Sequence, residues 1–188
     1  VDMQLNSTMR LITGNLRLTP LLWLPVLSNI EPPRRKAAVD RLVSRVAENN
    51  EWGLYSDIFQ PPKHRLASRH PLWTDMQPVD TGGRWQEDWQ TASVVNNSLV
   101  RDPAIQLPGF DLPRRQWSTL NRFRTDQGHC RACHKKWGLA NSDLCDCGEV
   151  QTMSHIVNTC PLTKFDGGLQ ELNRAGADAL EWLNNMSP

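Results

Sequence analysis

The chain contains 188 residues, enough for one or two small domains, and its hydrophobic content of 39% is ordinary for a globular protein once glycine is counted. A net charge of only +1 excludes a uniformly polycationic protein. No apolar run approaches the roughly 20 residues that a membrane-spanning helix requires, so we expect no membrane partner. Five cysteines, an odd number, favour a reducing intracellular compartment (nucleus or cytoplasm) over a disulfide framework.

The first 50 residues predict a small helical unit. One apolar helical face comprises Met3, Leu5, Met9 and Ile12. Gly14 is expected to end this helix, and Thr19 and Pro20 are expected to begin a short second helix that Pro25 ends. A third helix is predicted from about residue 31 to 46, with basic residues opposite its apolar face.

Residues 51–112 predict a proline-rich linker that contains one helix. Prolines and glycines interrupt every hydrophobic period over residues 51–83, which is long for a loop inside a compact domain. A helix is predicted from about Arg84 to Leu99, and a second proline-rich connector follows it over residues 102–113.

The third segment, residues 113–188, predicts a basic helix, a metal-binding loop and a last amphipathic helix. The basic helix is expected over 113–127, the loop over 143–161 and the last helix over 168–184. Signals for β-strands are nearly absent from the whole chain. The predicted fold class is therefore mostly α: a small helical unit, a proline-rich linker and a helical C-terminal region.

Positive charge is concentrated in one part of the chain. Residues 110–137 contain seven basic and two acidic residues, a local charge of +5, so the other 160 residues sum to −4. Such asymmetry indicates contact with a polyanion, although a run of charges is also typical of a solvated helix face. The candidate nucleic-acid-binding residues are Arg114, Arg115, Trp117, Arg122, Arg124, Lys135, Lys136 and Trp137. Core packing is the competing interpretation for the two tryptophans, because large aromatic side chains dominate burial.

The clearest chemical signal is a set of three cysteines and one histidine within sixteen residues: Cys145, Cys147, His155 and Cys160. Three thiolates and one imidazole are a ligand set of closed, tetrahedral structural zinc sites. The alternatives are four unpaired or buried side chains and a disulfide framework, which would leave one thiol over. A catalytic zinc ion is disfavoured, because four protein ligands leave no position for water.

A second cysteine motif lies upstream, between Cys130 and His134. The pattern Cys-x-x-Cys-His is the attachment motif of c-type haem, which requires an exported chain. A second metal site formed by His129, Cys130, Cys133 and His134 is another interpretation, although the adjacent Cys133 and His134 would strain a closed tetrahedron. The third interpretation is an ordinary basic turn.

Several of these motifs resemble the C-terminal region of reverse transcriptases from LINE-type, non-LTR retrotransposons. In the C-terminal half the matching residues are Gln116–Thr125, Lys136–Leu139, Cys145–Gly148, Gln151–Thr152, His155–Ile156 and Cys160–Pro161. In the N-terminal part they are Leu5–Asn6, Met9–Gly14, Thr19–Pro20 and Trp23–Leu27, which look like the thumb helices of that family. The resemblance covers both ends of the chain, and the cysteine–histidine block is its most specific part.

The resemblance implies a thumb-like segment over residues 1–50 and a zinc knuckle with ligands Cys145, Cys147, His155 and Cys160. The family's polymerase holds two metal ions with paired palm aspartates, and this sequence contains no Asp-Asp pair. Palm and endonuclease are absent as well. The leading hypothesis is therefore a polymerase fragment that binds RNA or DNA, with the rest of the polymerase as a further partner, and that is not an enzyme on its own.

Two other interpretations remain open from the sequence. One is a zinc-stabilised module that binds protein through apolar surface. The other is a decayed copy of a retroelement without a selected role. No nucleophile–base pair, carboxylate cluster or phosphate-binding loop indicates an independent enzyme.

Overall fold

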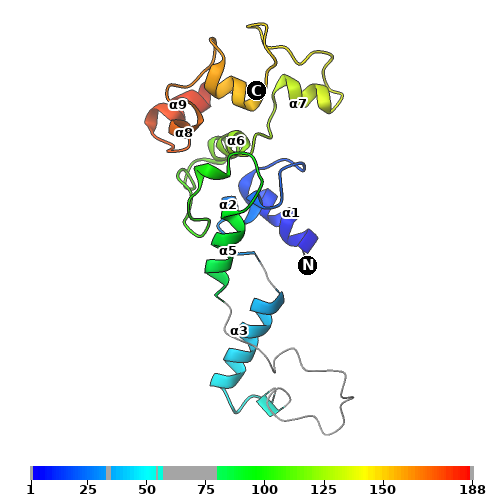
Figure 1. Cartoon of the computed structure of the whole chain (residues 1–188), viewed down its shortest axis with the longest axis vertical. Coiled ribbons are helices and arrows are strands. Elements are labelled where there is room, and N and C mark those ends of the chain that lie inside the picture. Colours follow the sequence, from blue (N-terminus) through cyan, green and yellow to red (C-terminus); the bar gives the residue numbers. More distant parts are fainter. Residues whose placement is uncertain (1, 33–34, 54, 57–79, 187–188) are drawn as a thin grey trace. The chain divides into compact units, whose positions relative to one another are not determined.

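A computed structural model of the chain describes residues 2–32, 35–53, 55–56 and 80–186, and its regular elements are all helical (Figure 1). The helices are α1 (Asp2–Thr13), α2 (Trp23–Ser28), α3 (Arg35–Glu48), α5 (Thr81–Gln90), α6 (Arg114–Arg124), α7 (Arg131–Lys136), α8 (Gly168–Leu172) and α9 (Ala177–Asn185). A 3-10 turn spans Asn97–Leu99 and a π-helical turn spans His155–Thr159. The described residues contain no β-strand beyond a single bridge, which confirms the mostly α prediction.

The compact units of the chain differ from the three predicted segments. One unit combines Val1–Glu31 with Trp85–Pro188, and the other is Pro32–Arg84. The boundaries predicted at residues 50 and 112 do not coincide with those of these units. Residues 85–112, predicted to be linker, belong to the larger unit, because their tryptophans pack with residues from both ends of the chain.

A cluster of tryptophans forms the first core of the larger unit. Trp23 of α2 and Trp89 of α5 meet edge to face with ring centroids 4.8 Å apart, and Trp85 and Trp117 join the same buried cluster. The indole N–H of Trp23 donates to the carbonyl oxygen of Val95 at 3.0 Å, and that of Trp89 donates to Val100 at 2.8 Å. A buried indole needs such an acceptor. These bonds fix the irregular segment after α5 against the core.

Helix α6 connects this cluster to a second core. Trp117 lies in the first cluster, whereas Leu120 and Phe123 lie in the second. The other members of the second core come from the segment after α6 and from α8 and α9: Cys130, Met153, Val157, Leu169, Leu172, Ala179 and Leu183. Two side chains of α6 donate hydrogen bonds to carbonyl groups at the C-terminal end of α1, which have no partner within that helix. Asn121 donates to the carbonyl of Thr13 at 3.0 Å, and Arg114 donates to the carbonyl of Ile12 at 2.7 Å.

The second predicted helix begins later than expected. It starts at Trp23 rather than at Thr19 or Pro20, and Pro25 lies in its first turn instead of ending it. A proline is tolerated there because the first backbone N–H groups of a helix have no partner within the helix. The helix ends at Ser28, and the backbone of the next residue, Asn29, is left-handed with φ 52°.

Two predicted long helices are interrupted. The helix expected over 84–99 ends at Gln90 and is followed by a turn. The helix expected over 168–184 divides into α8 and α9, because Ala175 adopts a positive φ of 55° between them. The basic helix predicted over 113–127 is observed as α6, three residues shorter at its C-terminal end.

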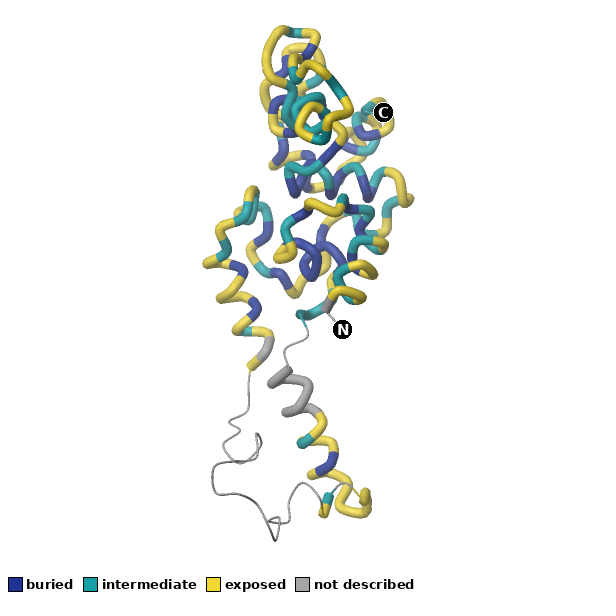
Figure 2. The backbone as a smooth tube through the Cα atoms, turned by 90° about the vertical axis from the view of Figure 1, so that its right-hand side faces the viewer, coloured by how far each residue is buried: buried dark blue, intermediate teal, exposed yellow. Residues whose placement is uncertain are grey.

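The smaller unit contains α3, most of whose described side chains are exposed (Figure 2). Val46 is buried, but Leu42, predicted on the same apolar face, is 47% exposed. Most of the loop predicted over 51–83 lies outside the described residues, as do His64 and His70.

Gly14 ends α1 as predicted, and its backbone has a φ of 69°. A β-carbon there would overlap the side chain of Ser118 on α6. We expect Gly14→Ala to lower the free energy of unfolding by roughly 2–4 kcal/mol, from the left-handed backbone and the overlap together. Gly138 is the matched control, because its φ is 73° and nothing lies near its missing side chain. Gly138→Ala should cost roughly 1–2 kcal/mol. Equal costs in urea unfolding would contradict the contact with Ser118.

Candidate metal centre and basic surface

The first two candidate ligands lie in a tight hairpin-like turn. Leu144 and Val150 form an antiparallel bridge, the N–H of Cys145 donates to the carbonyl of Glu149 at 2.7 Å, and the N–H of Gly148 donates back to Cys145 at 2.9 Å. Gly148 has a φ of 95°, which a side chain would disfavour. The turn therefore brings the side chains of Cys145 and Cys147 together.

The other two candidate ligands lie at the ends of a π-helical turn. The N–H of Cys160 donates to the carbonyl of His155, five residues earlier, at 2.8 Å. Residues five apart diverge around an α-helix, whereas the wider π turn places them on one side. This turn explains how a spacing of five residues directs His155 and Cys160 toward one point.

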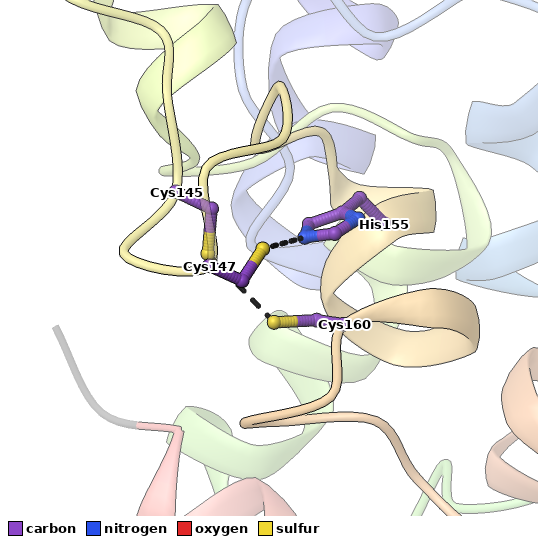
Figure 3. A group of neighbouring side chains, drawn as sticks. All are labelled: Cys145, Cys147, His155 and Cys160. Carbon is purple, nitrogen blue, oxygen red and sulfur yellow. Dashed lines mark hydrogen bonds between the residues drawn. The ribbon is translucent and has the colours of Figure 1, made fainter.

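The four side chains converge (Figure 3). Their ligand atoms all lie within 4.8 Å of one another, with Cys147 Sγ 3.2 Å from His155 Nε2 and Cys145 Sγ 3.7 Å from Cys160 Sγ. All four side chains are buried or half-buried. The predicted ligand set is thus gathered as one group that could hold a metal ion.

The second nitrogen of the His155 ring has partners of its own. Nδ1 lies 3.0 Å from the hydroxyl oxygen of Thr159 and 3.1 Å from a carboxylate oxygen of Glu149. The tautomer with its proton on Nδ1 satisfies both contacts and leaves the lone pair of Nε2 facing the sulfurs. Such an outer hydrogen bond fixes the tautomer of a metal-binding imidazole. The sequence analysis missed both partners, because acidic and hydroxyl residues are common in polar turns.

The environment of the thiols lowers the pKa of Cys145 and of Cys160 and so favours their thiolate forms. The backbone N–H of Cys147 is the largest factor that lowers the pKa of Cys145, to about 6. At Cys147 the N–H of Glu149 lowers the pKa, but burial and the neighbouring thiols of Cys145 and Cys160 raise it overall. A cation among the sulfurs would relieve this repulsion, since a metal ion binds the deprotonated forms.

Helix α7 is attached to the candidate metal centre by several polar contacts. The guanidinium of Arg131 donates to the carbonyl of Leu144 and to a carboxylate oxygen of Asp146, each at 2.7 Å. Lys135 forms an ion pair with Asp143 at 2.9 Å. Gln151 links the two parts, since its amide nitrogen lies 3.6 Å from Cys145 Sγ and its oxygen accepts the N–H of Arg131 at 3.0 Å. The sequence did not indicate α7.

Two of the predicted nucleic-acid-binding residues are buried, and those assignments are wrong. Trp117 belongs to the tryptophan core, beside Phe110. Arg124 has no exposed surface, and its guanidinium lies 5.3 Å from the centroid of the Trp117 ring. Burial lowers the pKa of Arg124 to about 9, so the side chain stays charged at neutral pH. Neither residue can contact a phosphate or a base.

The hydrogen bonds of Arg124 account for its burial. Nε donates to the amide oxygen of Asn173 at 2.7 Å and one terminal nitrogen to that of Asn121 at 3.1 Å. The other terminal nitrogen donates to the carbonyls of Pro108 at 2.7 Å and Asn173 at 3.1 Å. Every nitrogen is bonded, so this cation is a structural element.

The other predicted nucleic-acid-binding residues lie at or near the surface. Arg114, Arg115, Lys135 and Lys136 are exposed, and Arg122 and Trp137 are half-buried. Trp137 makes ring contacts with His129 and His134, at centroid distances of 5.8 and 5.7 Å. The structure therefore places Trp137 against two histidines at the end of α7, the helix that is attached to the candidate metal centre.

Cys130, Cys133 and His134 do not join a metal cluster in the part of the chain that the structure describes. Cys130 is buried in the second core, and burial raises its pKa to about 11. Cys133 packs against the same core, whereas His134 turns to His129, with ring nitrogens 3.1 Å apart. The cysteines here act as small apolar side chains.

None of the described helices combines the length and the apolar character that crossing a bilayer would require. Comparison with protein-family models, with curated proteins and with solved structures finds no match to this chain.

Proposed function

We propose that Cys145, Cys147, His155 and Cys160 bind one structural zinc ion. A tetrahedral ion about 2.3 Å from each sulfur holds two sulfurs about 3.8 Å apart. The 3.7 Å between Cys145 Sγ and Cys160 Sγ supports this assignment, as does the orientation of His155 Nε2. With three thiolates and one imidazole the coordination is complete, so the ion stabilises the fold and leaves no position for a reacting water.

The zinc-bearing segment is proposed to be part of a nucleic-acid-binding module. The observation that carries this proposal is the attachment of α7 to the metal centre through Arg131 and Lys135, because it fixes the adjoining Lys136 and Trp137 in place. Lys136 is exposed and has no hydrogen bond or ion pair with any described residue. The resemblance to the C-terminal region of LINE-type reverse transcriptases supports the same function.

Binding of this kind depends mainly on phosphates. Arg115 and Lys136 contact the backbone of RNA or DNA and release its condensed counterions. The ring of Trp137 stacks on an unpaired base, since its histidine neighbours contact it only edge-on or tilted. The module is proposed to contribute nucleic-acid affinity to a larger polymerase, whose paired palm aspartates have no counterpart among the residues of this sequence.

The proposal predicts that nucleic-acid binding weakens as salt is added and that Lys136→Gln removes one phosphate contact. Labelled single-stranded RNA and duplex DNA are titrated with the zinc-loaded chain at several salt concentrations, with and without chelator. Lys136→Gln should reduce the slope of log K against log salt by about 0.7 for RNA. Arg101→Gln removes the same charge from an exposed residue outside α7 and should leave the slope unchanged. Affinity that is absent, or equal at low and high salt, would refute the proposal.

A second candidate function is supported by exposed apolar residues in the N-terminal part. Met3 is 85% exposed and Leu11 is 71% exposed on α1, and Leu18, Leu21 and Leu22 follow before α2. Apolar surface of this kind is typical of a protein-binding site. This alternative predicts a defined oligomer or complex in sedimentation and no shift of labelled nucleic acid.

A further inference from the structure

A cavity lies between α6, the segment after it, the zinc-bearing loop and the end of α9. Its volume is about 250 Å³, and the polar residues that line it include Thr119, Arg122, His129, Gln151 and Asn185. Phe123, Met153 and Ile156 form an apolar part of the wall. No carboxylate belongs to the lining among the described residues, so the charged groups at this cavity are basic.

Arg122 brings an uncompensated cation to this cavity. Its Nε is buried and has no hydrogen-bond partner, and the side chain forms no ion pair with any described residue. Burial lowers the pKa of Arg122, and no neighbouring charge offsets that effect. An unpaired, partly desolvated cation is unfavourable unless an anion joins it.

Arg124 provides the contrast to Arg122 on the same helix. The two arginines lie two residues apart on α6, yet each nitrogen of Arg124 has an acceptor in the protein. The fold thus satisfies one arginine completely and leaves the other facing a cavity. A structural role accounts for Arg124 and does not account for Arg122.

His129 adds a second basic group to the same cavity. Burial, the charge of Arg122 and the charge of His134 each lower the pKa of His129. Asp126, which lies between α6 and His129 in the sequence, accepts the backbone N–H of Ser154 at 3.2 Å and does not line the cavity. A bound anion would reduce the repulsion between the two basic side chains and make protonation of His129 easier.

We propose that this cavity binds a phosphate group of a nucleic-acid strand, held by Arg122 and His129. Phosphate fits better than carboxylate, because it offers oxygens to both an arginine fork and an imidazole that approach from different elements. The wall formed by Met153 and Ile156 then contacts the adjoining sugar or base. The choice of a nucleic acid rests on the proposed function, whereas the anion site rests on the cavity alone.

The test uses the full, zinc-loaded chain and two probes, inorganic phosphate and a short single-stranded RNA. In NMR titrations both probes should shift the Nε–H resonance of Arg122 and raise the pKa of His129. Arg122→Gln should weaken RNA binding about tenfold, the effect of one charge-assisted contact. Arg101→Gln removes the same charge from an exposed arginine that does not line the cavity, and it should leave RNA binding unchanged.

A stability measurement separates this role from a structural one. Removing an unsatisfied cation should leave the thermal unfolding midpoint of the free chain unchanged or raise it, so Arg122→Gln should lose binding without losing stability. Arg122→Lys, which keeps the charge but lacks the fork, should bind RNA more weakly than the wild type and more tightly than Arg122→Gln.

Three outcomes would overturn the inference. RNA binding by Arg122→Gln that equals binding by the Arg101→Gln control would exclude the cavity but leave the proposed function intact. A shift of Arg122 by inorganic phosphate without any RNA binding would exclude a nucleic acid as the ligand, and the proposed function with it. A failure of both probes to shift Arg122 or His129 in the wild type would exclude an anion site.

Discussion

Replacing Cys145 with serine is expected to abolish zinc binding and to unfold residues 143–161. Zinc contributes about 10–16 kcal/mol of apparent binding free energy in small zinc-dependent peptides. Because these peptides fold only when zinc binds, the same free energy stabilises their fold. The turn around Cys145 has one bridge, Leu144 to Val150, and few buried side chains of its own. Without the ion, the repulsion among thiolates and the loss of cross-links leave little to hold the turn.

The indole N–H signals of two tryptophans can show which parts of the chain unfold in Cys145→Ser. The indole N–H of Trp182 donates to the carbonyl of Thr163 at 2.8 Å, just after Cys160, whereas that of Trp89 donates to Val100 in the tryptophan core. In ¹⁵N–¹H spectra the Trp182 indole signal should shift or disappear in Cys145→Ser and after chelation. The Trp89 signal should stay in place.

Cys133→Ser is the matched control for this experiment. Cys133 is half-buried like Cys147, and it lies outside the group of four ligands. Metal analysis should give one zinc ion per chain for the wild type and for Cys133→Ser, and close to none for Cys145→Ser. Unchanged zinc content in Cys145→Ser would refute the ligand assignment. Loss of zinc in Cys133→Ser would revive the upstream cysteine motif as a metal site.

Replacing Arg124 with methionine is expected to reduce the free energy of unfolding by about 3 kcal/mol or more. The change leaves the amide oxygens of Asn121 and Asn173 and the carbonyl of Pro108 without their donor. Each buried acceptor without a partner costs about 1–3 kcal/mol. The stacking of the guanidinium on Trp117 is lost as well.

Arg122→Met provides the comparison on the same helix. Because Arg122 has no ion pair and its Nε has no hydrogen bond, this variant should match the wild type or exceed it in stability. Urea unfolding at a fixed, saturating zinc concentration measures both variants. If Arg124→Met lies within about 1 kcal/mol of the wild type, the buried network does not stabilise the fold as described.

The residues of the candidate metal centre could be predicted from the sequence because its determinants are local. Cys145, Cys147, His155 and Cys160 lie within sixteen residues, and few functions require those side chains at such spacing. Local rules also predicted the end of α1 at Gly14, where a positive φ favours glycine. The mostly α class followed from helical periodicity and the scarcity of strand signals.

The break between α8 and α9 could not be predicted in this way. Alanine has no preference for a positive φ, yet Ala175 adopts one. Gly109, which is 66 positions earlier in the sequence, approaches it so closely that a β-carbon at Gly109 would lie 2.9 Å from that of Ala175. Packing against a distant segment therefore determines where the predicted helix divides.

The sequence by itself determined which residues can bind a metal and which helices are amphipathic, because both depend on neighbours along the chain. Only the tertiary structure decided the role of each basic residue. Arg122 and Arg124 are the same residue type on one helix, but the partner that buries Arg124 is Asn173, 49 positions away. Charge and periodicity do not encode such a contact, since it arises from the packing of helices that are distant in sequence.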